Sequence, residues 1–185
     1  MSDEDLLRTE LLVIRCQRGD PSAFASIVEL WERPLFYYLR RLTPSEAVTW
    51  DMIQETWLRA FRSIKTLRDP RALPAFLYRT ARNAAISHLR DQQRERPLTN
   101  PPDDNAASWD HVAAFDNAED VHHALDQLPI AQREALTLYF LQDLSLDEIA
   151  TLLGVAVGTV KSRLHYGKLA IRKILQGDDH ANQRP

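Results

Sequence analysis

The stretch LSLDEIATLLGVAVGTVKSRL, from Leu144 to Leu164, carries the start, stop and packing signals of two short helices joined by a turn. Ser145 and Glu148 stand at the spacing of a capping box, which predicts that a helix begins at Ser145. Gly154 tolerates the positive φ that ends a helix, and Val160 belongs to the inward face of the next one. The pattern predicts a helix-turn-helix.

The second of these helices is predicted to have an outer face of cations and hydroxyls. The outward groups are Thr159, Lys161, Ser162, Arg163, His165, Tyr166 and Lys168. From Gly158 to Gln176 the chain has five Lys or Arg residues and no acid. Such groups contact phosphate oxygens and base edges in the major groove, so duplex DNA is the predicted ligand. The alternative is a solvated cationic face on an ordinary helical bundle.

The composition of the 185 residues is that of a globular protein, with 44% hydrophobic and 26% charged residues. Helical periodicity recurs along most of the chain and alternating strand patterns are absent, which predicts an all-α fold. A membrane-length apolar run and a signal-peptide charge pattern are also lacking, so we expect a cytoplasmic protein without membrane insertion. The single cysteine, the missing Gly-rich phosphate loop and the missing nucleophile motif predict a protein that is not an enzyme and needs no cofactor or metal.

Negative charge is concentrated between Pro97 and Asp120. This segment has six acids and no Lys or Arg, so the net charge of −3 for the whole chain leaves +3 outside it. Its prolines and asparagines are typical of an extended, flexible linker. We therefore expect two small helical domains at 1–95 and 119–177, an acidic linker at 96–118 and a disordered tail at 178–185.

The N-terminal half shows four helical patterns. The first spans Asp5 to Arg18, the second starts at Pro21 with Asp20 as N-cap, the third runs from about Pro44 to Ile64 with Thr43 in a capping box, and the fourth runs from about Pro74 to Gln92. One face of the third carries Asp51, Glu55, Arg59 and Arg62, for which plain solvation is the alternative to binding. The fourth presents Arg79, Arg82 and Asn83 beside the ring of Tyr78, a surface suited to unpaired bases and phosphates.

The order of these motifs along the chain resembles one known family. WDMIQETWLRAFRSI (50–64), PAFLYRTARNAAISHLR (74–90), an acidic linker and LPIAQREALTLYFLQDLSLDEIATLLGVAVGTVKSRLHYGKLAIRKIL (128–175) follow one another as in the extracytoplasmic-function sigma factors of bacterial RNA polymerase. The resemblance covers nearly the whole chain. It implies a monomeric, dissociable initiation subunit whose partners are core RNA polymerase and promoter DNA.

The resemblance also implies a role for each candidate residue. Core polymerase binding would use Asp51, Gln54, Glu55, Arg59 and Arg62. Melting and reading the single-stranded −10 element would use Lys65, Arg68, Arg71, Tyr78, Arg79, Arg82 and Asn83, while the −35 element would be read as duplex by the seven outward groups of the helix-turn-helix. A flipped base captured by the protein offsets the few kcal/mol lost in unstacking it, so binding can open DNA without ATP.

The residues ahead of the Gln54–Glu55 pair depart from the family pattern, which commonly has several acids there. Val48, Thr49 and Trp50 replace them, which predicts weak polymerase binding. A phosphate on Thr49 would add about −1.5 to −2 charges at this place, so we hypothesise control by a Ser/Thr kinase. The alternatives are an ordinary Thr49 beside a Trp50 that packs on polymerase, and control by an anti-sigma factor.

Two other classes of protein fit parts of the pattern. A repressor or activator that acts alone would dimerise and bind a palindromic site without polymerase. A sigma-like adaptor would bind polymerase but not promoters.

Overall fold

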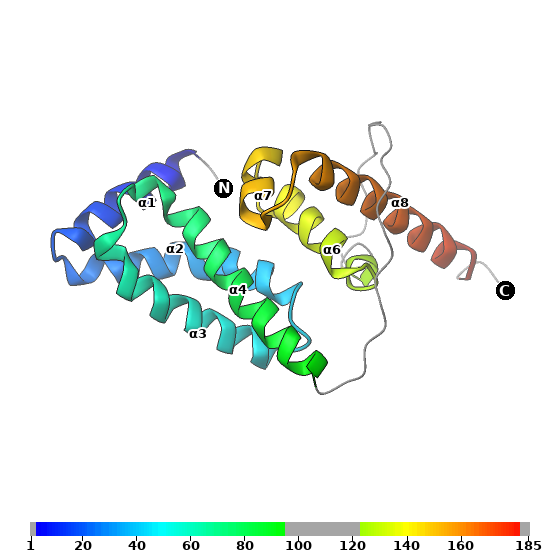
Figure 1. The fold of residues 1–185 in the computed structure, drawn as a ribbon, viewed down its shortest axis with the longest axis horizontal. Coiled ribbons are helices and arrows are strands. Elements are labelled where there is room, and N and C mark those ends of the chain that lie inside the picture. The colour runs from blue at the N-terminus through cyan, green and yellow to red at the C-terminus, as the bar shows by residue number, and fades with distance from the viewer. Residues whose placement is uncertain (1–2, 95–122, 182–185) are drawn as a thin grey trace. The chain divides into compact units, whose positions relative to one another are not determined.

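The structure, a computed structural model, describes residues 3–94 and 123–181 and divides the chain into two compact units, Met1–Asn100 and Pro101–Pro185. Every regular element in the two described ranges is helical (Figure 1). The predicted all-α class with two helical units is therefore confirmed. The predicted linker at 96–118 lies outside the described residues. No helix in the described ranges is long and apolar enough to span a membrane.

In unit 1 the helices α1 (Asp3–Gln17) and α2 (Pro21–Arg40) pack along each other. Asp20 is the N-cap of α2, as predicted, and its carboxylate accepts a hydrogen bond from the Ser22 amide at 2.9 Å. Hydrogen bonds from Ser22 and from Arg15 lower the pKa of Asp20 to about 2. The turn between the two helices is therefore fixed by an aspartate that stays ionised.

The helix α3 (Glu46–Ser63) begins later than predicted, and Thr43 is not its cap. Ser45 is the N-cap, and its hydroxyl accepts a hydrogen bond from the Val48 amide at 3.4 Å. Thr43 instead lies buried at the end of α2, where its hydroxyl is 3.0 Å from the carbonyl oxygen of Leu39. The predicted capping box at Thr43 is wrong because this side chain points into the protein and not toward the first turn of α3.

Two 3₁₀ turns, η1 (Ile64–Thr66) and η2 (Pro70–Ala72), connect α3 to α4 (Leu73–Arg94). Asp69 caps η2 and accepts a hydrogen bond from the Arg71 amide at 3.0 Å. Asp69 and Pro70 therefore begin a short turn, and α4 follows it directly. The core of unit 1 is built around α2, which packs against α1, α3 and α4.

Unit 2 contains a short helical stretch at 123–126, α6 (Ile130–Leu136), the π-helical turn η3 (Thr137–Leu141), α7 (Leu146–Leu153) and α8 (Val157–Ala181). α8 packs against both α6 and α7. Both hydrogen bonds of the predicted capping box of α7 are present, and Gly154 ends the helix with φ 68°. α8 is longer than predicted, because the residues 178–181 assigned to a disordered tail are helical.

Candidate nucleic-acid interface and apolar groove

The helix-turn-helix is formed by α7, the turn after Gly154 and the first turns of α8. The carbonyl oxygen of Ala156 accepts hydrogen bonds from the amides of Thr159 and Val160 at 2.9 and 3.2 Å, so α8 is nucleated by backbone bonds. Val160 and Leu164 are fully buried against the neighbouring helices. Their burial directs the opposite side of α8 outward.

The seven predicted duplex-binding residues lie along the first turns of α8 in two rows that flank this outward side. Thr159, Ser162, Arg163 and Tyr166 follow one another at helical i, i+3, i+4 and i+7 spacing, and Lys161, His165 and Lys168 form the second row, on the other flank. Lys161 is exposed and the other six are half-buried. Lys168 also lies over the Phe140 ring, with its ammonium nitrogen 5.0 Å from the ring centroid. The structure thus leaves all seven predicted residues at least partly accessible, on the two sides of the outward face of α8, with Lys168 partly engaged by a cation–π contact.

Arg133, in the stretch LPIAQRE (128–134), has a structural role at the start of α6. Its guanidinium donates hydrogen bonds to the carbonyl oxygens of Asp126 and Leu128 at 2.9 and 3.0 Å. These carbonyls lie where the helical stretch 123–126 ends and α6 begins. Because helix ends leave carbonyl groups without helical partners, Arg133 fixes the turn that leads into α6.

A groove of about 540 Å³ lies over α2 and α3 in unit 1. Phe24, Glu32, Trp50, Asp51, Ile53, Gln54, Trp57, Leu58 and Phe61 line it. Of the five residues expected to bind polymerase, only Asp51 and Gln54 reach this groove. Glu55 and Arg59 form an ion pair with each other, and Arg62 is exposed.

The aromatic lining of the groove was not predicted from the sequence. Trp57 is half-buried and makes an edge contact with Phe24 at 6.0 Å between ring centroids, and Phe24 makes another with Phe61 at 5.1 Å. Leu58 and Phe61 are 53% and 62% exposed, which is unusual for apolar side chains that lie one turn apart. The sequence did contain a sign of this groove, because α3 has more apolar residues than one core-facing side of a helix can bury.

Six of the seven residues expected to bind single-stranded DNA lie on accessible surface. Lys65, Arg68, Arg71, Arg79 and Asn83 are exposed and Arg82 is half-buried. Arg71 forms an ion pair with Asp69 at 3.1 Å, and the nearby carboxylate weakens the attraction of Arg71 for a phosphate.

Tyr78 is the exception, and its predicted place among the residues that bind the −10 strand is wrong. The side chain is only 2% exposed and makes edge contacts with Trp31 and Tyr38 at 6.0 and 5.3 Å between ring centroids. Burial raises the pKa of its phenol well above the usual value. A base cannot reach this ring, so Tyr78 supports the fold of unit 1.

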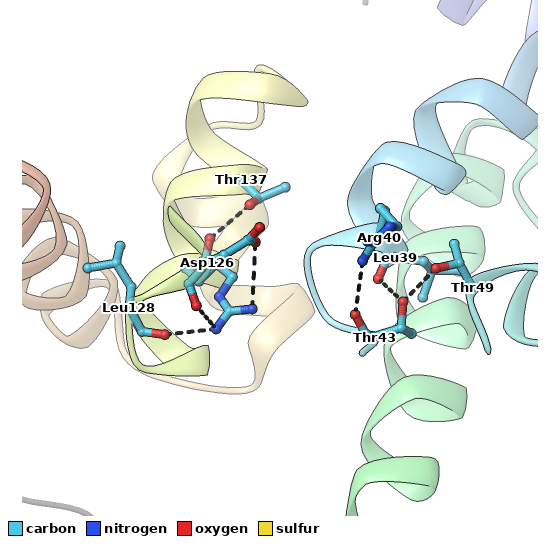
Figure 2. Close-up of polar contacts among 8 residues, drawn as sticks. Leu39, Arg40, Thr43, Thr49, Asp126, Leu128 and Thr137 are labelled. Atoms are coloured by element: carbon cyan, nitrogen blue, oxygen red, sulfur yellow. Dashed lines mark hydrogen bonds and ion pairs between the residues drawn. The ribbon is translucent and has the colours of Figure 1, made fainter. Parts of the chain in front are cut away.

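The structure buries Thr49, the hypothesised phosphorylation site. Its side chain is fully buried, and its hydroxyl oxygen lies 2.6 Å from that of Thr43 (Figure 2). The same oxygen lies 3.0 Å from the Ser45 carbonyl oxygen. Because each hydroxyl has one proton, these two residues share a short chain of hydrogen bonds between the end of α2 and the start of α3. A phosphate on Thr49 would require this junction to open.

Two family models match the chain, Sigma-70 region 2 over residues 27–95 and Sigma-70, region 4 over residues 118–171. Together they define the class of protein that the helix-turn-helix and the helical unit 1 indicate, a promoter-recognition subunit of the sigma-70 type. The RNA polymerase sigma-H factor of Pseudomonas aeruginosa is 32% identical, over 89% of this chain and 92% of that protein. The sigma-E factor of Escherichia coli is 31% identical, over 92% of this chain and 95% of that protein. The chain belongs to the extracytoplasmic-function sigma factors of RNA polymerase.

Solved structures show the same fold. The sigma factor RpoE of Bartonella quintana, in complex with the anti-sigma factor NepR, has a TM-score of 0.67 and 24% identity, covering 83% of this chain and 96% of that chain. CnrH, in complex with the cytosolic domain of CnrY, also has a TM-score of 0.67, with 20% identity over 92% of this chain and 99% of that chain.

Proposed function

We propose that unit 2 reads the −35 element as duplex DNA through the outward face of α8. The observation that carries this proposal is the set of accessible cationic and hydroxyl side chains along the first turns of α8, which begins at Thr159, directly after the turn of the helix-turn-helix. Residues near the N-terminus of such a second helix contact base edges, and cations beside them contact phosphates.

Replacing Lys161 by Ala is expected to weaken binding of the −35 duplex about tenfold, because this exposed ammonium lies in the first turns of α8. A phosphate contact would also reduce the slope of log affinity against log salt by about one unit. Fluorescence anisotropy over a salt series measures both quantities. Lys173→Ala removes the same charge from an exposed position 12 residues further along α8 and is the matched control. Equal effects of the two substitutions would contradict a specific role for Lys161.

We propose that unit 1 captures the non-template strand of the −10 element. The support is a run of exposed cations, Lys65, Arg68 and Arg79, which the turns η1 and η2 and the helix α4 carry. Cationic grooves that follow a single strand bind it through its phosphates. The protein supplies binding energy and has no catalytic step of its own.

We further propose that the apolar groove is the site for the clamp helices of the polymerase's largest subunit. The exposed leucine and aromatic side chains offer an apolar contact, and Asp51 and Glu32 on its lining favour a partner with cations beside its apolar residues. Apolar contacts in this groove would supply part of the polymerase affinity that other family members obtain from acids ahead of the residue corresponding to Gln54.

The free protein would be a monomer in the cytoplasm, where RNA polymerase is.

Replacing Leu58 by Asp is expected to weaken core polymerase binding by tenfold or more, because a desolvated charge replaces an apolar anchor. Leu7→Asp is the matched control, since Leu7 is 63% exposed on α1 and does not line the groove. Titration of labelled protein with core polymerase measures both affinities. Equal affinities of the two variants would exclude the groove as the binding site.

The experiment that tests the whole proposal mixes the purified protein with bacterial core polymerase and measures co-elution and transcription from a promoter library. A complex that yields promoter-specific transcripts is expected. DNA binding by a dimer at a palindromic site, without any polymerase complex, would favour a regulator that acts alone. A polymerase complex without promoter-specific transcripts would favour the adaptor.

We propose that control comes from a protein partner and not from a kinase that acts on Thr49. The support is that the Thr49 side chain is fully buried and that its hydroxyl is hydrogen-bonded to the hydroxyl of Thr43. An anti-sigma factor is a candidate partner, since it is the partner in the solved complex of the Bartonella quintana sigma factor.

A further inference from the structure

We infer that Gln17, the last residue of α1, is a positioning residue for the segment 64–72 and thereby for the −10 strand. The inference rests on the proposed role of unit 1 in strand capture. Gln17 was not among the candidate residues, because nothing in the local sequence relates it to a segment that begins 47 residues away.

The side-chain amide of Gln17 bridges two carbonyl groups of this segment. Its Nε2 atom donates to the carbonyl oxygen of Leu67 at 2.8 Å and to that of Ile64 at 3.3 Å. An amide has two N–H donors, so one side chain satisfies both acceptors. Leu67 is in extended conformation, with φ −66° and ψ 116°, at the point where the chain leaves η1. Its carbonyl is thus held by a different helix and not by a local turn.

A buried side chain begins the segment and another follows it directly, with exposed cations between the two. Ile64 and Leu73 are buried, at 4% and 1% exposure, whereas Lys65 and Arg68 are exposed. The hydrogen bond of Thr66 to Ser63 and the ion pair of Arg71 with Asp69 are both local. The bonds from Gln17 reach the segment from α1, which packs against both η1 and η2.

Fixing the segment before DNA arrives lowers the cost of capturing a strand. A loop that is ordered only on binding loses conformational entropy at that moment, which reduces the affinity. Gln17 sets the direction in which the chain leaves η1, and Lys65 and Arg68 lie on either side of that point. The amide therefore acts on the −10 strand through the backbone and does not touch the DNA.

The substitution Gln17→Glu tests this role with almost no change in shape. The carboxylate has no N–H donor and faces two carbonyl oxygens, so both bonds are lost. Gln17→Met loses the same donors without adding charge. Leu7→Glu adds a negative charge to an exposed place on α1 and controls for repulsion of DNA.

The readout is strand opening by reconstituted polymerase, on a promoter that the wild-type complex selects, with a fluorescent base analogue in the −10 non-template strand. We expect both Gln17 variants to open this promoter about three- to tenfold less, in line with the loss of one or two neutral hydrogen bonds. Hydrogen exchange of the amides at 64–72 should accelerate, whereas affinities for core polymerase and for the −35 duplex should match the wild type. The Leu7→Glu control should open the promoter normally.

Normal opening by both Gln17 variants would overturn the inference. So would an equal loss of core binding or of folding in both variants, because Gln17 would then support the fold in general. Failure of the wild-type complex to open any promoter is a separate result, which would overturn the proposed function of unit 1 itself.

Discussion

Replacing Thr49 by Asp is expected to destabilise unit 1 by about 3–5 kcal/mol, the usual cost of an uncompensated buried charge. The position has no exposed surface, and its hydroxyl is already in contact with Thr43 and with the carbonyl oxygen of Ser45. A carboxylate there would be desolvated and would face a carbonyl oxygen. Chemical denaturation followed by circular dichroism measures the loss, and transcription should fall with it.

Thr49→Val is the matched control for this substitution. It keeps the shape and removes only the hydroxyl, and Thr43 can still donate to the Leu39 carbonyl, so we expect a loss of only about 1 kcal/mol. The pH dependence separates a charge effect from a packing effect. Burial raises the pKa of the introduced carboxyl group in the folded Thr49→Asp variant, so the variant's stability is highest below the unfolded pKa of about 4 and falls as the pH rises from there through the folded pKa.

A Thr49→Asp protein that is as stable as the wild type and more active would contradict the structure at this point. It would mean that the junction between α2 and α3 opens easily and that a phosphate can be accommodated there. Equal destabilisation at about pH 4 and about pH 8, on either side of the expected titration, would attribute the loss to packing and not to charge.

The elements that could be predicted from sequence are those whose signals are local. The helix-turn-helix is such a case, because Ser145, Glu148 and Gly154 determine the ends of α7 within a short stretch of chain. The cap of α2 at Asp20 is another. The outward face of α8 followed from helical periodicity once these ends were known.

The wrong predictions concern residues whose positions are determined by contacts between segments that are far apart in the sequence. Thr43 and Ser45 are both good N-caps by residue type, and the choice falls on Ser45 because Thr43 bonds back to α2. Tyr78 looked exposed because it lies next to Arg79, yet its ring is held by Trp31 and Tyr38 from a different helix. The groove was missed for the same reason, since its lining comes from both α2 and α3.

Replacing Gly167 by Val is expected to destabilise unit 2 by about 3 kcal/mol, through overpacking between α6 and α8. Gly167 is buried, and a Cβ atom placed on it would lie 2.7 Å from Cδ1 and 3.3 Å from Cγ of Leu136. Leu136 is itself only 3% exposed, so it has little room to move away. Thermal unfolding measures the loss, and affinity for the −35 duplex should fall because α8 carries the proposed DNA-binding face.

Gly158→Ala is the matched control on the same helix. A Cβ atom at Gly158 meets nothing within 4 Å, so this substitution should be neutral or should stabilise unit 2 by about 0.5 kcal/mol through helix propensity. The double variant Gly167→Val with Leu136→Ala tests the mechanism, since the smaller side chain removes the clash. Its loss of stability should be smaller than the sum of the two single losses, because residues in contact do not act additively. Additive losses would instead show that Gly167 is needed for a reason other than the close approach of α6 to α8.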